Sequence, residues 1–231
     1  MTRTIPRCFR IVDLKINCIY CDGCCVKNGH SHGKQRLLCK SCKRTFTSKY
    51  TYNACQPGIN RMIISLLKEG CGVRSISRLL QISVVTVLKR LLIISDAVVQ
   101  PSFCLSRAYE VDELCTYIGH KANRQWIVYA ICRESKIIAG FCVGSRSKDT
   151  INSVIRTLLL YDPLMICTDK FHLYRLLVPA SLHQTKLRST NHIERKNLTL
   201  RTHLKRLSRR TICFSRSAAM LIACLKIYFW G

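Results

Sequence analysis

Acidic residues are scarce in this sequence, which has 12 aspartates and glutamates against 38 lysines and arginines and a formal net charge of +26. Such a charge over 231 residues favours a polyanionic partner, and nucleic acid is the usual one. An anionic membrane surface is the alternative, but the basic residues are spread through several predicted elements and do not flank one amphipathic anchor. The composition therefore predicts a nucleic-acid-binding protein, in which each of the few carboxylates is a candidate for a specific role.

Long apolar runs are also lacking, because no segment approaches the roughly 18 uncharged apolar residues of a membrane span. The segment Met1–Pro6 is charged early, and no apolar run with a cleavage site follows it, so no secretory signal is indicated. Hydrophobic residues still make up 48% of the chain, which is ample for a core. We therefore expect a cytoplasmic protein with no membrane partner.

Cysteine is abundant, with 16 residues, and a disulfide framework is one interpretation of that number. Without a secretory signal, small buried thiols are the better interpretation for cysteines that stand singly in apolar stretches. These cysteines are Cys115, Cys132, Cys142, Cys167, Cys213 and Cys224.

The N-terminal cysteines form two C-x2-C pairs separated by 17 residues, and a turn-rich hairpin between the pairs could bring them together. Four thiolates suit tetrahedral zinc, and four protein ligands leave no open position for chemistry, so the spacing predicts a structural zinc ribbon over residues 1–50. The expected ligands are Cys18, Cys21, Cys39 and Cys42. Nearby residues that could substitute, but that we expect to be bystanders, are Cys24, Cys25, His30 and His32. A zinc ribbon does not by itself define the function.

Residues 51–95 carry a helical pattern in three parts, at 61–70, 73–80 and 83–92, with Ser83 as a suitable N-cap for the last. This is the layout of a helix-turn-helix, in which the last helix lies in the major groove of DNA. Ser83, Thr86 and Lys89 are the candidates to approach bases or phosphates. The side chains expected to pack inward are Val84, Val87, Leu88 and Leu91. A three-helix core without DNA contact is the alternative, and 96–106 is the expected linker.

From residue 107 the pattern changes to that of strands, at 107–118, 126–132 and 136–143. An amphipathic helix at 149–160, with Asp149 as its cap, and a short buried strand at 164–168 follow. The pattern alone predicts a mixed α/β domain over 107–231. Trp126 is interpreted as a core residue, with a position near substrate as the alternative.

Three carboxylates in this domain could share divalent metal. Asp112 lies in the first strand, Asp169 follows the short strand, and Glu194 lies near the start of a basic helix predicted for 191–210. Magnesium prefers oxygen ligands, and a pair of ions can activate the attacking oxygen and stabilise the leaving one in phosphoryl transfer. Alternatively, Glu194 pairs with a neighbouring cation. The apolar stripe expected along the helix is Ile193, Leu200, Leu204 and Leu207.

Other polar groups in the domain are weaker candidates. Glu110, Glu113 and Asp149 are further carboxylates, but Glu113 is expected on the strand face opposite Asp112, which disfavours the two as ligands to one site. His192 could approach the metals, although histidines are common at exposed helix starts.

The triad Asp112, Asp169 and Glu194, with 24 residues between the last two, resembles that of DDE transposases. Segments 190–204 and 206–210 are similar to the IS1 insertion-sequence transposases, in which a helix-turn-helix likewise follows a zinc ribbon. The resemblance implies a ribonuclease H-like catalytic domain with Asp112 and Asp169 on adjacent central strands, using Mg2+ or Mn2+. Arg201 matches the basic residue seven positions after the family's glutamate, which would contact phosphate or steady Glu194.

The resemblance further implies double-stranded DNA partners, namely element ends and target, a homo-oligomer on DNA, and association with a prokaryotic nucleoid. It implies cleavage of the element's ends followed by transfer of their 3′ hydroxyls to target DNA. Two other functions remain open. A transcription regulator with an inert α/β region would not need the acids, and a structure-selective nuclease would cleave without joining.

Overall fold

The computed structural model describes residues 16–47, 51–102, 105–186, 189–208 and 213–231. It divides into two compact units, Met1–Gln56 and Pro57–Gly231, and each is described by itself. The segment examined for a secretory signal and the last two residues of the predicted basic helix, 209–210, lie outside the described residues.

The first unit is built on an antiparallel sheet of three strands, β1 (Cys25–Ser31), β2 (Lys34–Cys39) and β3 (Thr45–Thr47), in that order. A short 3-10 helix, η1 (Asn53–Cys55), follows. Its buried core consists of Cys18, Leu37, Cys39 and Phe46. So small an apolar core does not usually hold a domain together without a metal or a cross-link.

The second unit begins with three helices, α1 (Ile59–Lys68), α2 (Val73–Leu80) and α3 (Val84–Ala97). As expected, Ser83 caps α3, because its hydroxyl accepts a hydrogen bond from the Thr86 N–H at 3.0 Å. The expectation that Val84 packs inward is wrong, since it is 38% exposed and lies beside the cap, whereas Val87 is fully buried. The helix also continues two residues into the expected linker.

Gly70 ends α1 in a left-handed conformation, with φ of +81°, and packs closely on the end of α6 (Asn191–His203). A Cβ at this position would lie 2.6 Å from the carbonyl oxygen of His203. Backbone atoms cannot move aside as a flexible side chain can. This contact therefore requires glycine both for its backbone angle and for space.

We expect Gly70→Ala to lower the free energy of unfolding by roughly 2 to 3 kcal/mol, since alanine at positive φ costs about 1 kcal/mol and the close contact adds to it. Gly58→Ala is the matched control, because Gly58 shares the φ of +81° but has no atom within 4 Å of its added Cβ. Urea unfolding of both variants measures the difference. Equal losses would show that the contact with α6 does not constrain residue 70.

A five-stranded mixed sheet forms the centre of the second unit. Its strands are β4 (Ala108–Ile118), β5 (His120–Cys132), β6 (Ile138–Gly144), β7 (Met165–Cys167) and β8 (His183–Gln184). The spatial order is β6-β5-β4-β7-β8. The strands β6, β5 and β4 are antiparallel to one another, and β7 is parallel to both β4 and β8. This is the ribonuclease H-like arrangement that was expected, and it places β4 beside β7.

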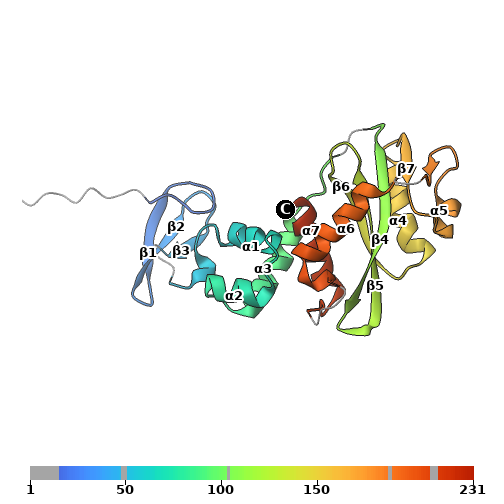
Figure 1. Ribbon diagram of the computed structural model, residues 1–231. Helices are drawn as coiled ribbons and strands as arrows, with labels where there is room; N and C mark the ends of the chain where they lie inside the picture. Colours follow the sequence, from blue (N-terminus) through green and yellow to red (C-terminus); the bar gives the residue numbers. More distant parts are fainter. Residues whose placement is uncertain (1–15, 48–50, 103–104, 187–188, 209–212) are drawn as a thin grey trace, which may run out of the picture. The chain divides into compact units, whose positions relative to one another are not determined.

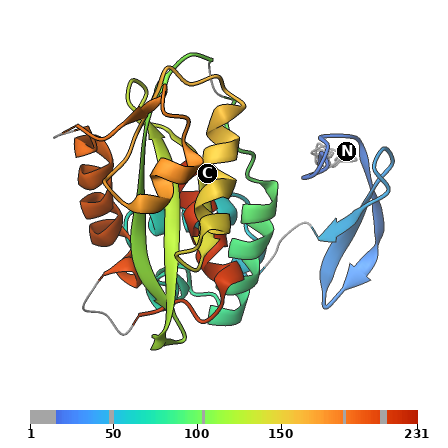
Figure 2. The ribbon, with the colours of Figure 1, turned by 90° about the vertical axis from the view of Figure 1, so that its right-hand side faces the viewer.

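Helices cover both faces of this sheet, as Figures 1 and 2 show. On one face lie α4 (Lys148–Leu159) and α5 (His172–Leu177), and on the other lie α6 and α7 (Ala218–Trp230). The cap of α4 is Ser147, whose hydroxyl accepts from the Thr150 N–H at 3.4 Å. The prediction of Asp149 as the cap is therefore wrong by two residues, and Asp149 lies in the first turn.

The helix α7 joins the helix-turn-helix to the sheet within the second unit. It is apolar on nearly all sides, which is typical of a helix buried between two layers. It packs against α3 and α1, and its Phe229 ring stacks on Tyr129 of β5 at 5.9 Å between centroids. The Trp230 Nε1–H donates to the Ile138 carbonyl at 2.8 Å. The bounds of this helix were not predicted from the sequence.

The basic helix is shorter than predicted, because α6 ends at His203 and a 3-10 turn, η2 (Lys205–Leu207), follows. All four residues of the predicted stripe are nevertheless buried, at 0 to 2% exposure. The periodicity thus identified the buried face correctly although the last two residues reach it from a different backbone. Within the described part of the chain, no helix combines the length and the apolarity needed to cross a bilayer.

Candidate catalytic site and cysteine cluster

Three carboxylates come together at the centre of the sheet. Oxygens of Asp112, Glu113 and Asp169 all lie within 4.8 Å of one another. Asp112 lies in β4, and Asp169 follows the end of β7, the strand that pairs with β4. The parallel pairing of β4 with β7 therefore brings together two aspartates that are 57 positions apart in the sequence.

Glu113 belongs to this group by distance, although strand alternation disfavours it and Asp112 as ligands to one site. Strand alternation does direct it away from Asp112, but β7 ends at Cys167, opposite Glu110. Beyond that pair β4 has no described strand on this edge, so side chains from both faces can reach Asp169. Glu113 is buried, and its Oε1 lies 3.6 Å from Arg146 Nε.

Arg146 links Glu113 to two aromatic rings. Its guanidinium carbon lies 3.9 Å from the ring centroid of Phe171 and 4.6 Å from that of Trp126. Trp126 is half-buried beside this pair, so its interpretation as a core residue is wrong. Arg146 could not be identified from the sequence, because one arginine among so many basic residues has no distinguishing pattern.

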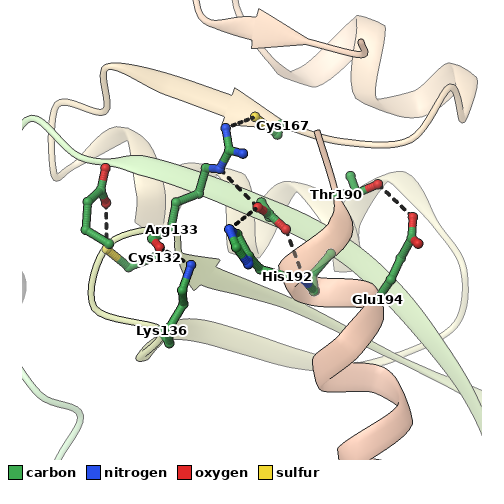
Figure 3. A network of polar contacts seen from close by, with 10 residues as sticks. Cys132, Arg133, Lys136, Cys167, Thr190, His192 and Glu194 are labelled. Carbon is green, nitrogen blue, oxygen red and sulfur yellow. Dashed lines mark hydrogen bonds and ion pairs between the residues drawn. The ribbon is translucent and has the colours of Figure 1, made fainter. Parts of the chain in front are cut away.

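Glu194 projects from the first turn of α6 and is exposed. Its Oε1 accepts a hydrogen bond from the Thr190 hydroxyl at 2.9 Å, as Figure 3 shows. Glu194 does not belong to the group of three carboxylates within 4.8 Å. Its charge nevertheless contributes to raising the pKa of Asp112. Glu194 thus lies outside the group of three, and its carboxylate is held by Thr190, the N-cap residue of α6.

Asp112 is fixed by two hydrogen bonds. The Glu113 N–H donates to its Oδ1 at 2.8 Å, and the Asn197 amide donates to its Oδ2 at 2.6 Å. The hydroxyl of Tyr129, on β5, in turn donates to Asn197 Oδ1 at 2.8 Å. Asn197 is buried between Ile193 and Leu200 on the apolar stripe of α6, and a polar residue at a core-facing position was the signal that could have identified it.

The remaining sequence candidates lie around this group. Arg201 is half-buried, and its charge lowers the pKa of Tyr129 against the larger effect of burial, which raises it. His192 and Glu194 leave α6 on opposite sides in Figure 3, and His192 Nε2 lies 4.0 Å from Glu110 Oε1. Asp149 is exposed at the start of α4 and is not part of the acidic group among the described residues.

The electrostatics of the group fit a bound cation. Burial raises the pKa of Asp112, and the charges of Asp169 and Glu194 raise it further. Burial likewise raises the pKa of Glu113 to about 7, with Asp169 and Asp112 adding to the effect and Arg146 opposing it. The buried Oε1 of Glu113 has no hydrogen-bond partner among the described residues. A divalent cation would relieve the repulsion among these carboxylates, and Glu113 Oε1, whose only ion pair among the described residues is the 3.6 Å contact with Arg146, could also bind it.

In buffers without divalent metal, we expect stability to fall as the pH rises from about 4.5 to about 7. The folded protein holds the Glu113 proton more tightly than the unfolded chain, whose glutamate pKa is 4.5, so unfolding releases it within this window. The loss is up to about 3 kcal/mol, since each pH unit between the two pKa values contributes about 1.4 kcal/mol. Glu113→Gln should reduce this slope and leave the part that comes from Asp112, whose pKa is also raised. An equal dependence of the unfolding free energy on pH in the two proteins would contradict the prediction.

The four predicted zinc ligands come together in the first unit. The Sγ atoms of Cys18, Cys21, Cys39 and Cys42 all lie within 4.8 Å of one another. The nearest contacts are 3.6 Å between Cys18 and Cys42 and 3.5 Å between Cys21 and Cys39. Each C-x2-C pair also receives a backbone N–H, from Tyr20 to Cys18 Sγ and from Cys42 to Cys39 Sγ, both at 3.4 Å.

These backbone donors favour thiolates, which are the metal-binding form of cysteine. The Cys42 N–H is the main reason that the pKa of Cys39 falls to about 6. By contrast, burial raises the pKa of Cys25 to about 11, and its thiol donates to the Gly23 carbonyl. Cys24 is exposed, and His30 and His32 are exposed on the β1–β2 hairpin. None of these four joins the cluster among the described residues.

A ribonuclease H-like sheet that brings carboxylates together on adjacent central strands defines a class of metal-dependent enzymes acting on phosphodiesters. The comparisons with known proteins narrow this class. Residues 106–228 match the family model described as IS1 transposase, and residues 50–92 match the model described as InsA C-terminal domain. The chain belongs to the IS1 transposase family. It is a DDE-type DNA transposase with a DNA-binding helix-turn-helix.

Curated relatives agree with this assignment. The chain is 38% identical over 108 residues to the insertion element iso-IS1n protein InsB of Shigella dysenteriae, covering 47% of this chain and 82% of the relative. It is 34% identical over 119 residues to the insertion element IS1 2 protein InsB of Escherichia coli (strain K12), covering 52% and 71%. The chain thus carries in one polypeptide a region similar to InsB and one similar to the C-terminal domain of InsA.

Solved structures also show similarity. The HTLV-2 integrase catalytic core domain in complex with magnesium is 14% identical, with a TM-score of 0.36, covering 55% of this chain and 86% of that one. A chain of the simian T-cell lymphotropic virus intasome in complex with a PP2A regulatory subunit is 17% identical, with a TM-score of 0.38, covering 70% and 66%.

Proposed function

We propose that Asp112, Asp169 and Glu194 together hold two Mg2+ or Mn2+ ions for DNA cleavage and strand transfer. The single observation that carries this proposal is the convergence of Asp112 and Asp169, with Glu113, within 4.8 Å in a chain of net charge +26. Glu194 completes the set from α6, where Thr190 holds its carboxylate. When bound, such ions activate the attacking oxygen and stabilise the leaving one. Glu113 is an additional ligand available to the same ions.

The protein groups bind and orient the DNA during two successive displacements. In the first, water attacks the phosphodiester at the element's end and the 3′ oxygen leaves. In the second, that 3′ hydroxyl attacks target DNA, and a target 3′ oxygen leaves. No covalent enzyme intermediate is required. Arg201, seven positions after Glu194 on α6, contacts a substrate phosphate or steadies that carboxylate, since a guanidinium can hold phosphate through two hydrogen bonds.

The helix-turn-helix recognises the terminal inverted repeats of the element through Ser83, Thr86 and Lys89 on α3. The Ser83 and Thr86 side chains are 2.7 Å apart and form the helix cap, so they approach phosphates as parts of a helix N-terminus. Lys89 is exposed one turn later. This arrangement supports positioning on the backbone by the cap and a longer-reaching contact by the lysine.

Lys89→Gln is expected to weaken binding to DNA and to reduce the slope of log affinity against log salt by about 1, because one phosphate contact is lost. Lys148→Gln is the matched control, since Lys148 is also exposed but lies at the start of α4 in the catalytic domain. Fluorescence anisotropy at several salt concentrations measures both. If both variants changed the slope equally, α3 would have no special part in binding.

The remaining components follow the family. We propose that Zn2+ occupies the four-cysteine cluster as a structural ion and that this ribbon, residues 1–50, assists DNA binding. The chain acts as a homo-oligomer, since two element ends must be held together, and it acts on DNA in the bacterial nucleoid, as its bacterial relatives suggest. The linker at 96–106 separates the binding and catalytic segments in sequence, although their helices pack together.

A single assay distinguishes this function from the alternatives. Purified protein is incubated with Mg2+, a labelled element end and a target plasmid. We expect cleavage at the end and products in which the end is joined to the plasmid. Cleavage without joining would identify a nuclease. Binding without either reaction, unaffected by Asp169→Ala, would identify a transcription regulator.

A further inference from the structure

Glu110 is a fully buried carboxylate to which the proposed reaction gives no role. It lies two residues before Asp112 on β4, so both side chains leave the same face of the strand. Its exposure is 0%, in a chain with only 12 acidic residues. A buried charge is costly unless it is paired and hydrogen-bonded, so the partners of Glu110 show what it does.

The partners of the Glu110 carboxylate lie just after β5 and in the first turn of α6. Oε1 lies 3.0 Å from the Nε of Arg133, which follows β5, and Oε2 accepts a hydrogen bond from the backbone N–H of Ile193 at 2.9 Å. Ile193 lies in the first turn of α6, where N–H groups have no partner within the helix. Glu110 therefore caps α6 from the neighbouring sheet, and its charge suits the positive end of the helix.

Thr190 stands at the N-cap position of α6 but does not cap the helix with its side chain. Thr190 is the N-cap residue of α6, and a threonine in that position ordinarily accepts from the second or third N–H of the helix. Its side chain makes no such bond to the described part of the helix. Glu110 accepts the Ile193 N–H, and the Thr190 hydroxyl donates to Glu194 Oε1. The two roles, capping and orienting Glu194, are thus divided between two residues.

We propose that Glu110 is a positioning residue that sets the Glu194-bearing turn of α6 against the Asp112-bearing strand. The inference rests on the proposed metal-binding role of Glu194. Ile193 immediately precedes Glu194, so any movement of its N–H moves that carboxylate. One turn later the Asn197–Asp112 hydrogen bond forms a second tie between the same helix and strand. The Tyr129 hydroxyl also contacts both of these α6 residues, at the Ile193 carbonyl and at Asn197 Oδ1, but the bond to Glu110 is the one that holds the Ile193 N–H.

Two conservative variants separate the effect of the length of the Glu110 side chain from the effect of its charge. Glu110→Asp keeps the charge beside Arg133 but is too short for the Ile193 N–H. Glu110→Gln keeps a carbonyl that can accept from it but loses the charge. Val154→Ala, in the core on the other face of the sheet, is the control for stability alone. The readouts are melting temperature, Mn2+ binding by electron paramagnetic resonance, hydrogen exchange of the Ile193 amide, and end cleavage.

We expect Glu110→Asp to expose the Ile193 amide to exchange and to weaken Mn2+ binding and cleavage by about 10 to 100-fold, as is typical for groups that orient metal ligands. Glu110→Gln should lower the melting temperature yet bind Mn2+ much as the unaltered protein does. Val154→Ala should also lose only stability. Mn2+ binding and Ile193 protection that are unchanged in Glu110→Asp would overturn the proposal.

Glu194→Ala, measured alongside, separates this inference from the function on which it rests. If Glu194→Ala binds Mn2+ and cleaves DNA like the unaltered protein, the proposed role of Glu194 fails, whatever Glu110 does. If Glu194→Ala loses both properties and Glu110→Asp loses neither, the proposed function stands and the positioning role of Glu110 is refuted.

Discussion

Asp169→Asn is expected to reduce both end cleavage and strand transfer by about 10³-fold or more, equivalent to a barrier higher by at least roughly 4 kcal/mol. The physical reason is that Asp169 is the exposed member of a group whose oxygens lie within 4.8 Å of one another. Asparagine has nearly the same shape but no charge, so it weakens cation binding without emptying the space. Single-turnover cleavage of a labelled end in saturating Mg2+ measures the loss.

Asp149→Asn is the matched control for this variant. Asp149 is also exposed, in the first turn of α4, and lies outside the acidic group. It should cleave and join at the rate of the unaltered protein. Binding of the DNA end should be retained in both variants, because recognition is assigned to α3. Cleavage by Asp169→Asn within a few-fold of the control would remove the acidic group from the reaction.

Cys39→Ser should unfold the first unit while the second unit stays folded. Cys39 is completely buried and contributes both a sulfur to the cluster and part of a core that has four buried members among the described residues of this unit. Zinc binding supplies on the order of 10 kcal/mol to domains of this kind, and a missing ligand forfeits much of it. Zinc content of the full chain, together with limited proteolysis, measures the effect. We expect the variant to lose its zinc and the protease to cut mainly within the first unit, which ends at Gln56.

Cys24→Ser is the control for sulfur chemistry, because Cys24 is exposed and does not belong to the cluster. It should keep a full complement of zinc and resist proteolysis like the unaltered protein. A Cys39→Ser protein that retained zinc and protease resistance would show that other groups, such as those of the β1–β2 hairpin, hold the ion.

Short-range patterns predicted much of this molecule. Ser83 as a helix cap and the buried face of α6 follow from spacing and local hydrogen bonding, which depend on neighbouring residues alone. The cysteine cluster follows for the same reason, since two C-x2-C pairs joined by a hairpin leave few ways to place four thiols together.

The features that could not be predicted depend on where strands end and on contacts between residues far apart in the sequence. Alternation correctly directs Glu113 away from Asp112, but the early end of β7 opens an edge where both side chains approach Asp169. Trp126 lies under the Arg146 guanidinium, 20 positions along the chain, and alternation within one strand does not predict such a contact. Glu110 looked like one more acidic neighbour, and its role as a cap for α6 depends on a residue 83 positions away.

The central claim is that the acidic group binds divalent metal during catalysis, and anomalous scattering from crystals soaked in Mn2+ tests it most directly. A manganese peak within about 2.5 Å of carboxylate oxygens of both Asp112 and Asp169, with Glu194 in contact in the DNA-bound form, is the predicted result. A protein that joins DNA ends in Mn2+ yet shows its manganese only at other positions would contradict the account.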